Sequence, residues 1–122
     1  MKTATISKMK TGELISQFVD IAIAQDEALL YDDTAKYNRL YKEMDGIDKE
    51  LRSRGTAARL ELTGLYNHPN LQVRMKAAVH TLAIAADARR LLQAIADSKE
   101  LPQSLDAGMT LNAIERGIFK PT

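Results

Sequence analysis

The sequence predicts an all-α protein made of about three helical hairpins, and three observations lead to this fold class. Apolar residues recur at spacings of three and four along almost the whole chain, as in helices that bury one face. The alternation of Val, Ile and Thr that marks strands is missing. Proline and glycine divide the chain into helical segments joined by short loops, which favour antiparallel neighbours.

The first two predicted helices form the clearest hairpin. Thr11 can cap a helix over residues 11–31. Asp32 and Asp33 provide a capping start for a second helix, which Gly55 is expected to end because glycine tolerates a left-handed backbone. The expected buried stripe of the first helix is Leu14, Ile15, Phe18, Val19 and Ala22. The expected stripe of the second helix is Tyr37, Leu40, Tyr41, Met44, Ile47 and Leu51.

The rest of the chain predicts four shorter helices. Pro69 ends the third helix, because proline disfavours the helical conformation in the residue before it. Asn70 and Asp87 are expected to start the next two helices, and Gly117 to end the last one. The expected ranges are residues 56–66, 71–85, 87–98 and 104–116. The apolar residues of the last helix are Leu105, Met109, Leu111 and Ile114.

Length and composition are those of one domain. The chain has 122 residues, of which 45% are hydrophobic, and this is enough for a core without disulfides or metals. We therefore expect a single domain over residues 1–122, with residues 1–10 as a flexible N-terminal lead. The chain has no cysteine, and no apolar run has the length of a signal peptide or a membrane span. We expect a cytoplasmic protein with no membrane partner.

Residues 60–85, LELTGLYNHPNLQVRMKAAVHTLAIA, resemble one HEAT repeat. A leucine-rich helix precedes a turn with Pro69, and Val73 and Arg74 lead into a helix with small alanines. HEAT turns often carry aspartate where this chain has His68. With YNRLY at 37–41 and DAGMTL at 106–111, the chain also resembles a family of small uncharacterised bacterial proteins. The resemblance implies a right-handed α–α superhelix of the HEAT or armadillo kind, and no activity.

No catalytic, cofactor or metal motif stands out. Phosphate loops, nucleophile elbows, zinc-binding helices and calcium loops are all missing from the sequence. His68 and His80 are twelve residues apart, across a turn and half a helix, so we expect neither to bind a metal. Asp45 and Asp48 alternate with basic residues at helical spacing, as on a solvated face. We expect a protein that is not an enzyme and has no cofactor.

Two turns supply the best candidate for a protein-binding edge. If the hairpins alternate in direction, the turn after the first helix and the turn before the fourth lie at the same end of the stack. That would gather Tyr31, Asp32, Asp33, Tyr66, His68 and Arg74. Tyrosine and arginine are frequent anchors of protein interfaces. Helix capping and a bridge from an aspartate to Arg74 would explain the same residues without a partner.

Three arginines around the opposite turn give the alternative, a nucleic-acid surface. Arg52, Arg54 and Arg59 could contact a phosphate backbone. The net charge of +1 and the lack of aromatic residues beside these arginines speak against nucleic acid. The sequence therefore favours a protein–protein interaction or regulatory module in a bacterial cytoplasm. Two copies could pair through their end helices, since the first helix is strongly apolar.

Overall fold

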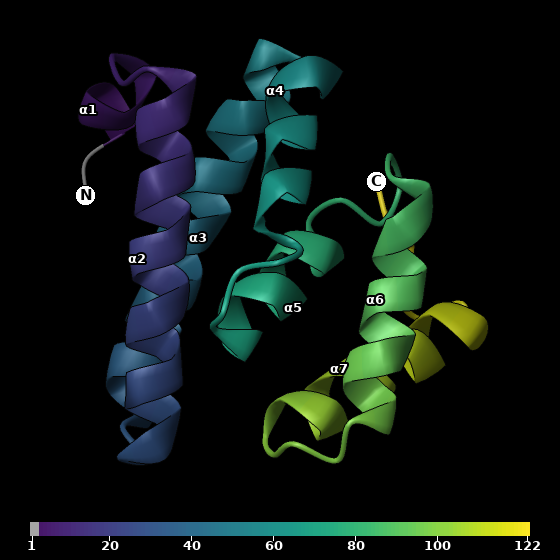
Figure 1. Ribbon diagram of the computed structural model, residues 1–122. Coiled ribbons are helices and arrows are strands. Elements are labelled where there is room, and N and C mark those ends of the chain that lie inside the picture. The colour runs from purple at the N-terminus through teal and green to yellow at the C-terminus, as the bar shows by residue number, and fades with distance from the viewer. Residues whose placement is uncertain (1–2) are drawn as a thin grey trace. The chain divides into compact units, whose positions relative to one another are not determined.

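The computed structural model describes residues 3–122, and over this range the chain is helical and has no strand, which confirms the all-α prediction (Figure 1). A 3₁₀ helix, η1 (Glu61–Leu65), follows α4 directly. The α-helices are α1 (Thr3–Ser7), α2 (Thr11–Leu30), α3 (Thr34–Arg54), α4 (Thr56–Leu60), α5 (Leu71–Val79), α6 (Ala86–Asp97) and α7 (Gln103–Glu115).

The contacts of the chain gather in two compact units. The first ends at Glu61 and contains α1 to α4, and the second, Leu62–Thr122, contains α5 to α7. The sequence predicts one domain over residues 1–122.

The core of the first unit lies between α2 and α3, which run side by side in opposite directions (Figure 1). α2 and α3 bury leucine, phenylalanine, methionine and isoleucine at the expected spacing of three and four residues. The fully buried large residues are Leu14, Phe18, Met44, Ile47 and Leu51. Tyr41, which the sequence assigns to the stripe of α3, is 57% exposed, because the stripe follows Leu40 and Met44 and leaves Tyr41 beside it.

Two aspartates in the hairpin turn make the hydrogen bonds that close the end of α2 and cap the start of α3. Asp32 has a φ of 53°, and its N–H donates to Leu29 O, while the N–H of Asp33 donates to Ala28 O at 2.8 Å. These two bonds are those of a Schellman motif, with an aspartate at the position that glycine usually takes. Asp33 then caps α3, since its Oδ1 accepts the N–H of Lys36 at 3.0 Å. The expected capping of the second helix is confirmed.

The start of α2 differs from the expected cap. Lys10, and not Thr11, precedes the helix, and its N–H donates to Glu13 Oε1 at 3.1 Å. The Thr11 hydroxyl instead accepts a hydrogen bond from Arg54 at 3.3 Å. Gly55 ends α3 with a φ of 105°, as the sequence predicts.

Part of the predicted flexible lead, residues 1–10, is helical. α1 packs on α3, and the side chain of Ile6 is 5% exposed. The guanidinium of Arg54 donates to Ile6 O at 3.3 Å and to Ser7 O at 3.4 Å. Burial of Ile6 and these bonds to the end of α1 hold residues 3–7 against α3.

The second unit packs α5, α6 and α7 around a small core. Its buried members are Met75, Ala78, Ala88, Leu92, Ile95, Ala107 and Leu111. The expected helix over residues 71–85 ends at Val79, and turns follow it. The Thr81 hydroxyl donates to Ala77 O at 2.7 Å, a bond that competes with helix continuation.

The last helix, α7, turns a different face to the core from the one that its apolar residues predict. α7 buries Gln103, Ser104, Ala107 and Leu111, whereas Leu105 and Met109 are 61% and 59% exposed. Small residues on α7 let it approach α6 closely, and a Cβ at Gly108 would lie 4.0 Å from Ala96 Cβ. At the other end, Gly117, with a φ of 70°, closes the helix as predicted, because the Ile118 N–H donates to Ala113 O.

Candidate functional site

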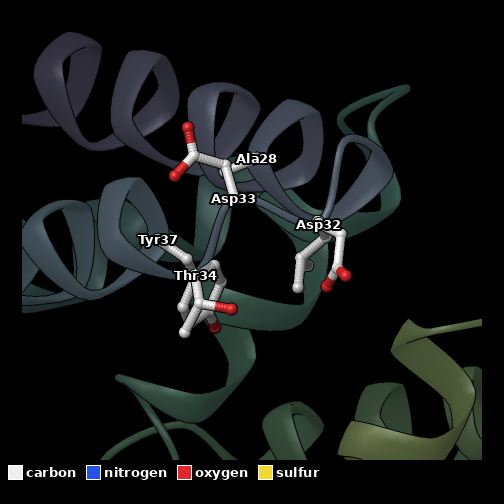
Figure 2. A pocket seen from close by; sticks show the side chains of 6 residues that line it. Ala28, Asp32, Asp33, Thr34 and Tyr37 are labelled. Atoms are coloured by element: carbon white, nitrogen blue, oxygen red, sulfur yellow. The ribbon is translucent and has the colours of Figure 1, made fainter.

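The turn between α2 and α3 carries a small pocket. It has a volume of about 130 Å³ and a mostly apolar lining. Its walls are Ala28, Leu29, Asp32, Asp33, Thr34 and Tyr37. Figure 2 shows the Asp32 and Asp33 carboxylates pointing in different directions, with Thr34 and Tyr37 close together. Two of the sequence-predicted partner residues, Asp32 and Asp33, therefore belong to one pocket.

Apolar side chains extend this site onto the surface. Leu30 is 76% exposed and Tyr31 is 72% exposed. Both lie at the C-terminal end of α2, next in sequence to Leu29 and Asp32 of the pocket lining. The sequence predicts Tyr31 as a partner-binding residue and misses Leu30, although a Leu-Leu-Tyr run at a helix end, followed by two aspartates, marks the place.

The charges of this turn are almost entirely negative. Residues 26–33 contain Asp26, Glu27, Asp32 and Asp33 and no basic residue. One oxygen of Asp33 is engaged by the helix cap of α3. Within residues 3–122 the Asp32 carboxylate makes no hydrogen bond or ion pair. Asp32 is therefore the carboxylate of the pocket that is available to a ligand.

The other predicted partner residues, Tyr66, His68 and Arg74, lie in the second unit. The Tyr66 ring packs against the core of that unit, and its hydroxyl hydrogen-bonds to Thr81 Oγ1. Since the Thr81 hydroxyl donates to Ala77 O, Tyr66 is the donor of this pair. Burial raises the pKa of Tyr66, the bond to Thr81 lowers it, and Asp87 raises it. Tyr66 thus has a packing role.

His68 and Arg74 flank the start of α5. His68 Nδ1 accepts the N–H of Asn70 at 3.0 Å, and Asn70 Oδ1 in turn accepts the N–H of Val73 at 3.1 Å. The predicted start of α5 at Asn70 is confirmed, and His68 stabilises the turn before it. Arg74 is half-buried, and among the described residues its Nε has no hydrogen-bond partner.

The three arginines of the alternative surface are held by their own unit. Arg52 Nε lies 2.8 Å from Asp48 Oδ2, and Arg54 Nε lies 2.9 Å from Glu50 Oε2. Arg59 is only 8% exposed. Burial lowers the pKa of Arg59, Arg52 lowers it further, and Asp48 opposes both effects. Arg52 and Arg54 are therefore paired within α3, Arg54 also holds the end of α1, and Arg59 is buried.

Among the described residues, no group of three or more His, Asp or Glu side chains is arranged to hold a metal ion. Over the same part of the chain, no helix has the length and apolar character needed to span a bilayer.

Comparisons with known proteins agree with the fold and assign no activity. The crystal structure of the protein RPA1889 from Rhodopseudomonas palustris CGA009 is 42% identical in sequence and superposes with a TM-score of 0.90. The match covers 96% of this chain and 98% of that one. A search of curated proteins finds no match. Residues 12–115 match the family model described as a domain of unknown function, DUF2019. Since this match spans most of the sequence, the chain belongs to the DUF2019 family.

Proposed function

We propose that this protein is a non-enzymatic protein–protein interaction module and that it binds its partner through the turn between α2 and α3. The observation that carries the proposal is the exposure of Leu30 and Tyr31, at 76% and 72%, beside the pocket that Asp32 helps to line. Tyrosine is enriched among interface residues that dominate binding energy. Apolar side chains beside a pocket lose unfavourable contact with water when a partner covers them.

A helical-repeat architecture is the second part of the proposal. We place the chain among short right-handed superhelices of the HEAT or armadillo kind, on the basis of the repeat-like pattern of residues 60–85. The small residues of that pattern are buried as such a repeat requires, since Ala77 and Ala78 are both fully buried. Repeat proteins of this type bind partners along surfaces built from successive turns. Within this proposal Tyr31, Asp32 and Asp33 of the first unit form the binding surface, in a cytoplasmic setting. The remaining residues of the predicted edge, Tyr66, His68 and Arg74, belong to the second unit.

The nucleic-acid alternative has less support. Phosphate contacts need guanidinium or ammonium groups whose hydrogen-bond donors are available. Arg52 and Arg54 are paired with carboxylates of their own helix, and Arg59 is buried. No observation on this chain favours nucleic-acid binding over protein binding.

Affinity capture from the native lysate tests the proposal. The tagged wild-type protein is compared with Leu30→Ala/Tyr31→Ala, with mass spectrometry of the proteins that co-purify and a nuclease-treated sample in parallel. We expect specific partners that survive nuclease and are lost with the double variant. Tyr41→Ala is the matched control, because Tyr41 is an exposed tyrosine of the same hairpin and lies outside the pocket lining.

Two results would contradict the proposal. Partners that disappear after nuclease treatment would favour nucleic-acid binding. Partners that bind Leu30→Ala/Tyr31→Ala as strongly as wild type, with the helical circular dichroism of the variant intact, would remove the α2–α3 turn as the binding surface.

A further inference from the structure

The pocket at the α2–α3 turn combines three properties that restrict what can occupy it. Its lining is apolar where Ala28, Leu29 and Tyr37 contribute, and it is acidic where Asp32 and Asp33 contribute. Its volume of about 130 Å³ is small. It lies beside the exposed Leu30 and Tyr31, in the surface that is proposed above to bind a partner.

The volume fits a short aliphatic chain. Each water-sized group fills ~30 Å³ in a liquid, so the pocket holds about four such groups. A lysine side chain has a stem of four carbons that ends in a compact ammonium group. Such side chains bury the stem along apolar surface and keep the charged end at the rim.

Charge complementarity selects a basic side chain over a neutral one. The segment 26–33 has four acidic residues and no basic one. The C-terminal end of α2 and the N-terminal end of α3 meet at this turn, and their partial charges oppose each other, so the carboxylates provide the negative charge. The Asp32 carboxylate has no partner among the described residues that would compete for it. Asp33 keeps its role as the cap of α3 and contributes charge.

We infer that the pocket receives a lysine side chain of the partner protein, with the aliphatic stem between Leu29 and Tyr37 and the ammonium at the Asp32 carboxylate. This inference rests on the proposed protein-binding function and specifies its chemistry. In the complex, the exposed Leu30 and Tyr31 then contact apolar residues of the partner next to that lysine. A partner segment with one lysine next to apolar residues matches this surface.

An NMR titration with a small probe tests the inference without the partner. The ¹⁵N-labelled full chain is titrated with n-butylammonium chloride, with 1-butanol and with sodium chloride at equal ionic strength. We expect saturable amide shifts confined to residues 28–37 with n-butylammonium, and weaker ones with 1-butanol. The ammonium effect should decrease when salt is raised, since exposed charge pairs are screened.

Two variants that preserve the turn separate charge from fold. Asp32→Asn keeps a residue that tolerates a positive φ, so the Schellman motif stays intact. We expect it to weaken n-butylammonium binding about fivefold, the effect of one exposed charge pair at the upper end of measured values. Asp20→Asn removes an exposed acid elsewhere on α2 and should bind like wild type.

The inference fails if n-butylammonium leaves residues 28–37 unchanged, if 1-butanol acts as strongly, or if Asp32→Asn binds the probe like wild type. Such a failure is distinguishable from failure of the proposed function. Leu30→Ala/Tyr31→Ala would still lose the captured partner if the turn binds protein through contacts other than a lysine.

Discussion

Tyr66 shows how a single residue of the predicted binding edge can be needed by the fold. Its hydroxyl donates to Thr81, whose own proton goes to Ala77 O, so the three groups form a chain of hydrogen bonds in the second unit. Thr81 is fully buried, and the Tyr66 ring covers part of the core. Substitutions at Tyr66 therefore act on stability before they act on binding.

The titration of Tyr66 leads to a prediction about alkaline pH. Its pKa is raised from 10.0, chiefly by burial, so the unfolded state releases the phenolic proton at a lower pH than the folded state. The stability that this hydroxyl contributes is fully present below pH 10.0 and is lost as pH rises through the folded pKa. At about pH 7 we expect Tyr66→Phe to be less stable by about 1 kcal/mol, the value of one hydrogen bond.

The measurement is urea unfolding of both proteins at a series of pH values. All other titrating groups are shared, so their effects cancel in the difference between the two proteins. The gap in the free energy of unfolding should narrow above pH 10.0, because only the wild type loses stability through this hydroxyl. A gap that stays constant across that range would contradict the assignment.

At the scale of elements, residues that satisfy helix ends made some boundaries predictable, whereas Thr11 and Asp87 do not cap the helices that they were expected to start. Asp33 and Asn70 accept N–H groups at the starts of α3 and α5, and Gly55 and Gly117 end α3 and α7 with positive φ. The rotation of α7 was not predictable, because Leu105 and Met109 have the same spacing as a buried pair. Close packing of Ala107 on its neighbours decides that rotation, and this depends on the surface of α6.

The candidate site was predictable only in part. Tyr31, Asp32 and Asp33 could be found because an acidic pair between two helical patterns marks a turn. The pocket depends on Leu29 and Tyr37, which line it. Their spacing in the sequence assigns each of them to a helix face, but it does not predict a pocket between them. The engagement of Arg54 could not be foreseen either, because it involves the carbonyls of Ile6 and Ser7, more than forty residues away in sequence.

Gly46 tests the packing of α1 against α3. It lies inside α3, where glycine costs stability relative to alanine, and a Cβ would lie 3.7 Å from Ile6 Cδ1 in ordinary contact. Gly46→Ala should therefore raise the free energy of unfolding by about 0.5–1 kcal/mol. Gly55→Ala is the opposing control and should lower it by about 1 kcal/mol, because its φ is 105°.

Chemical unfolding of the two glycine variants decides this point. A rise in the unfolding midpoint for Gly46→Ala, with a fall for Gly55→Ala, is the expected pattern. A destabilised Gly46→Ala would mean that Ile6 is packed too rigidly to accept one methyl group, and that the end of α1 is held more firmly than its contacts indicate.

At the scale of the whole molecule, we expect the predicted pairing of two copies to use the exposed apolar side chains of α7. Leu105 and Met109 lie four residues apart on α7 and are 61% and 59% exposed, and Leu101, which precedes the helix, is 74% exposed. Asp106 is the charged residue between Leu105 and Met109, and the apolar side chains of two copies can meet around a two-fold axis beside it. Three side chains are few beside the roughly 20–30 residues that each partner contributes to a standard interface, so the dimer should be weak.

Sedimentation velocity at increasing concentration tests this pairing. We expect the wild type to shift from monomer towards dimer between about 10 μM and 1 mM, the range of weak association. Leu105→Lys/Met109→Lys should remain monomeric throughout, because two charges would be buried against two others of the same sign. Leu30→Lys places a charge on an equally exposed leucine of the α2–α3 turn and should associate like wild type. If Leu30→Lys abolished association and the α7 variant did not, the turn would bind a second copy, and the apolar face of α7 would have another role.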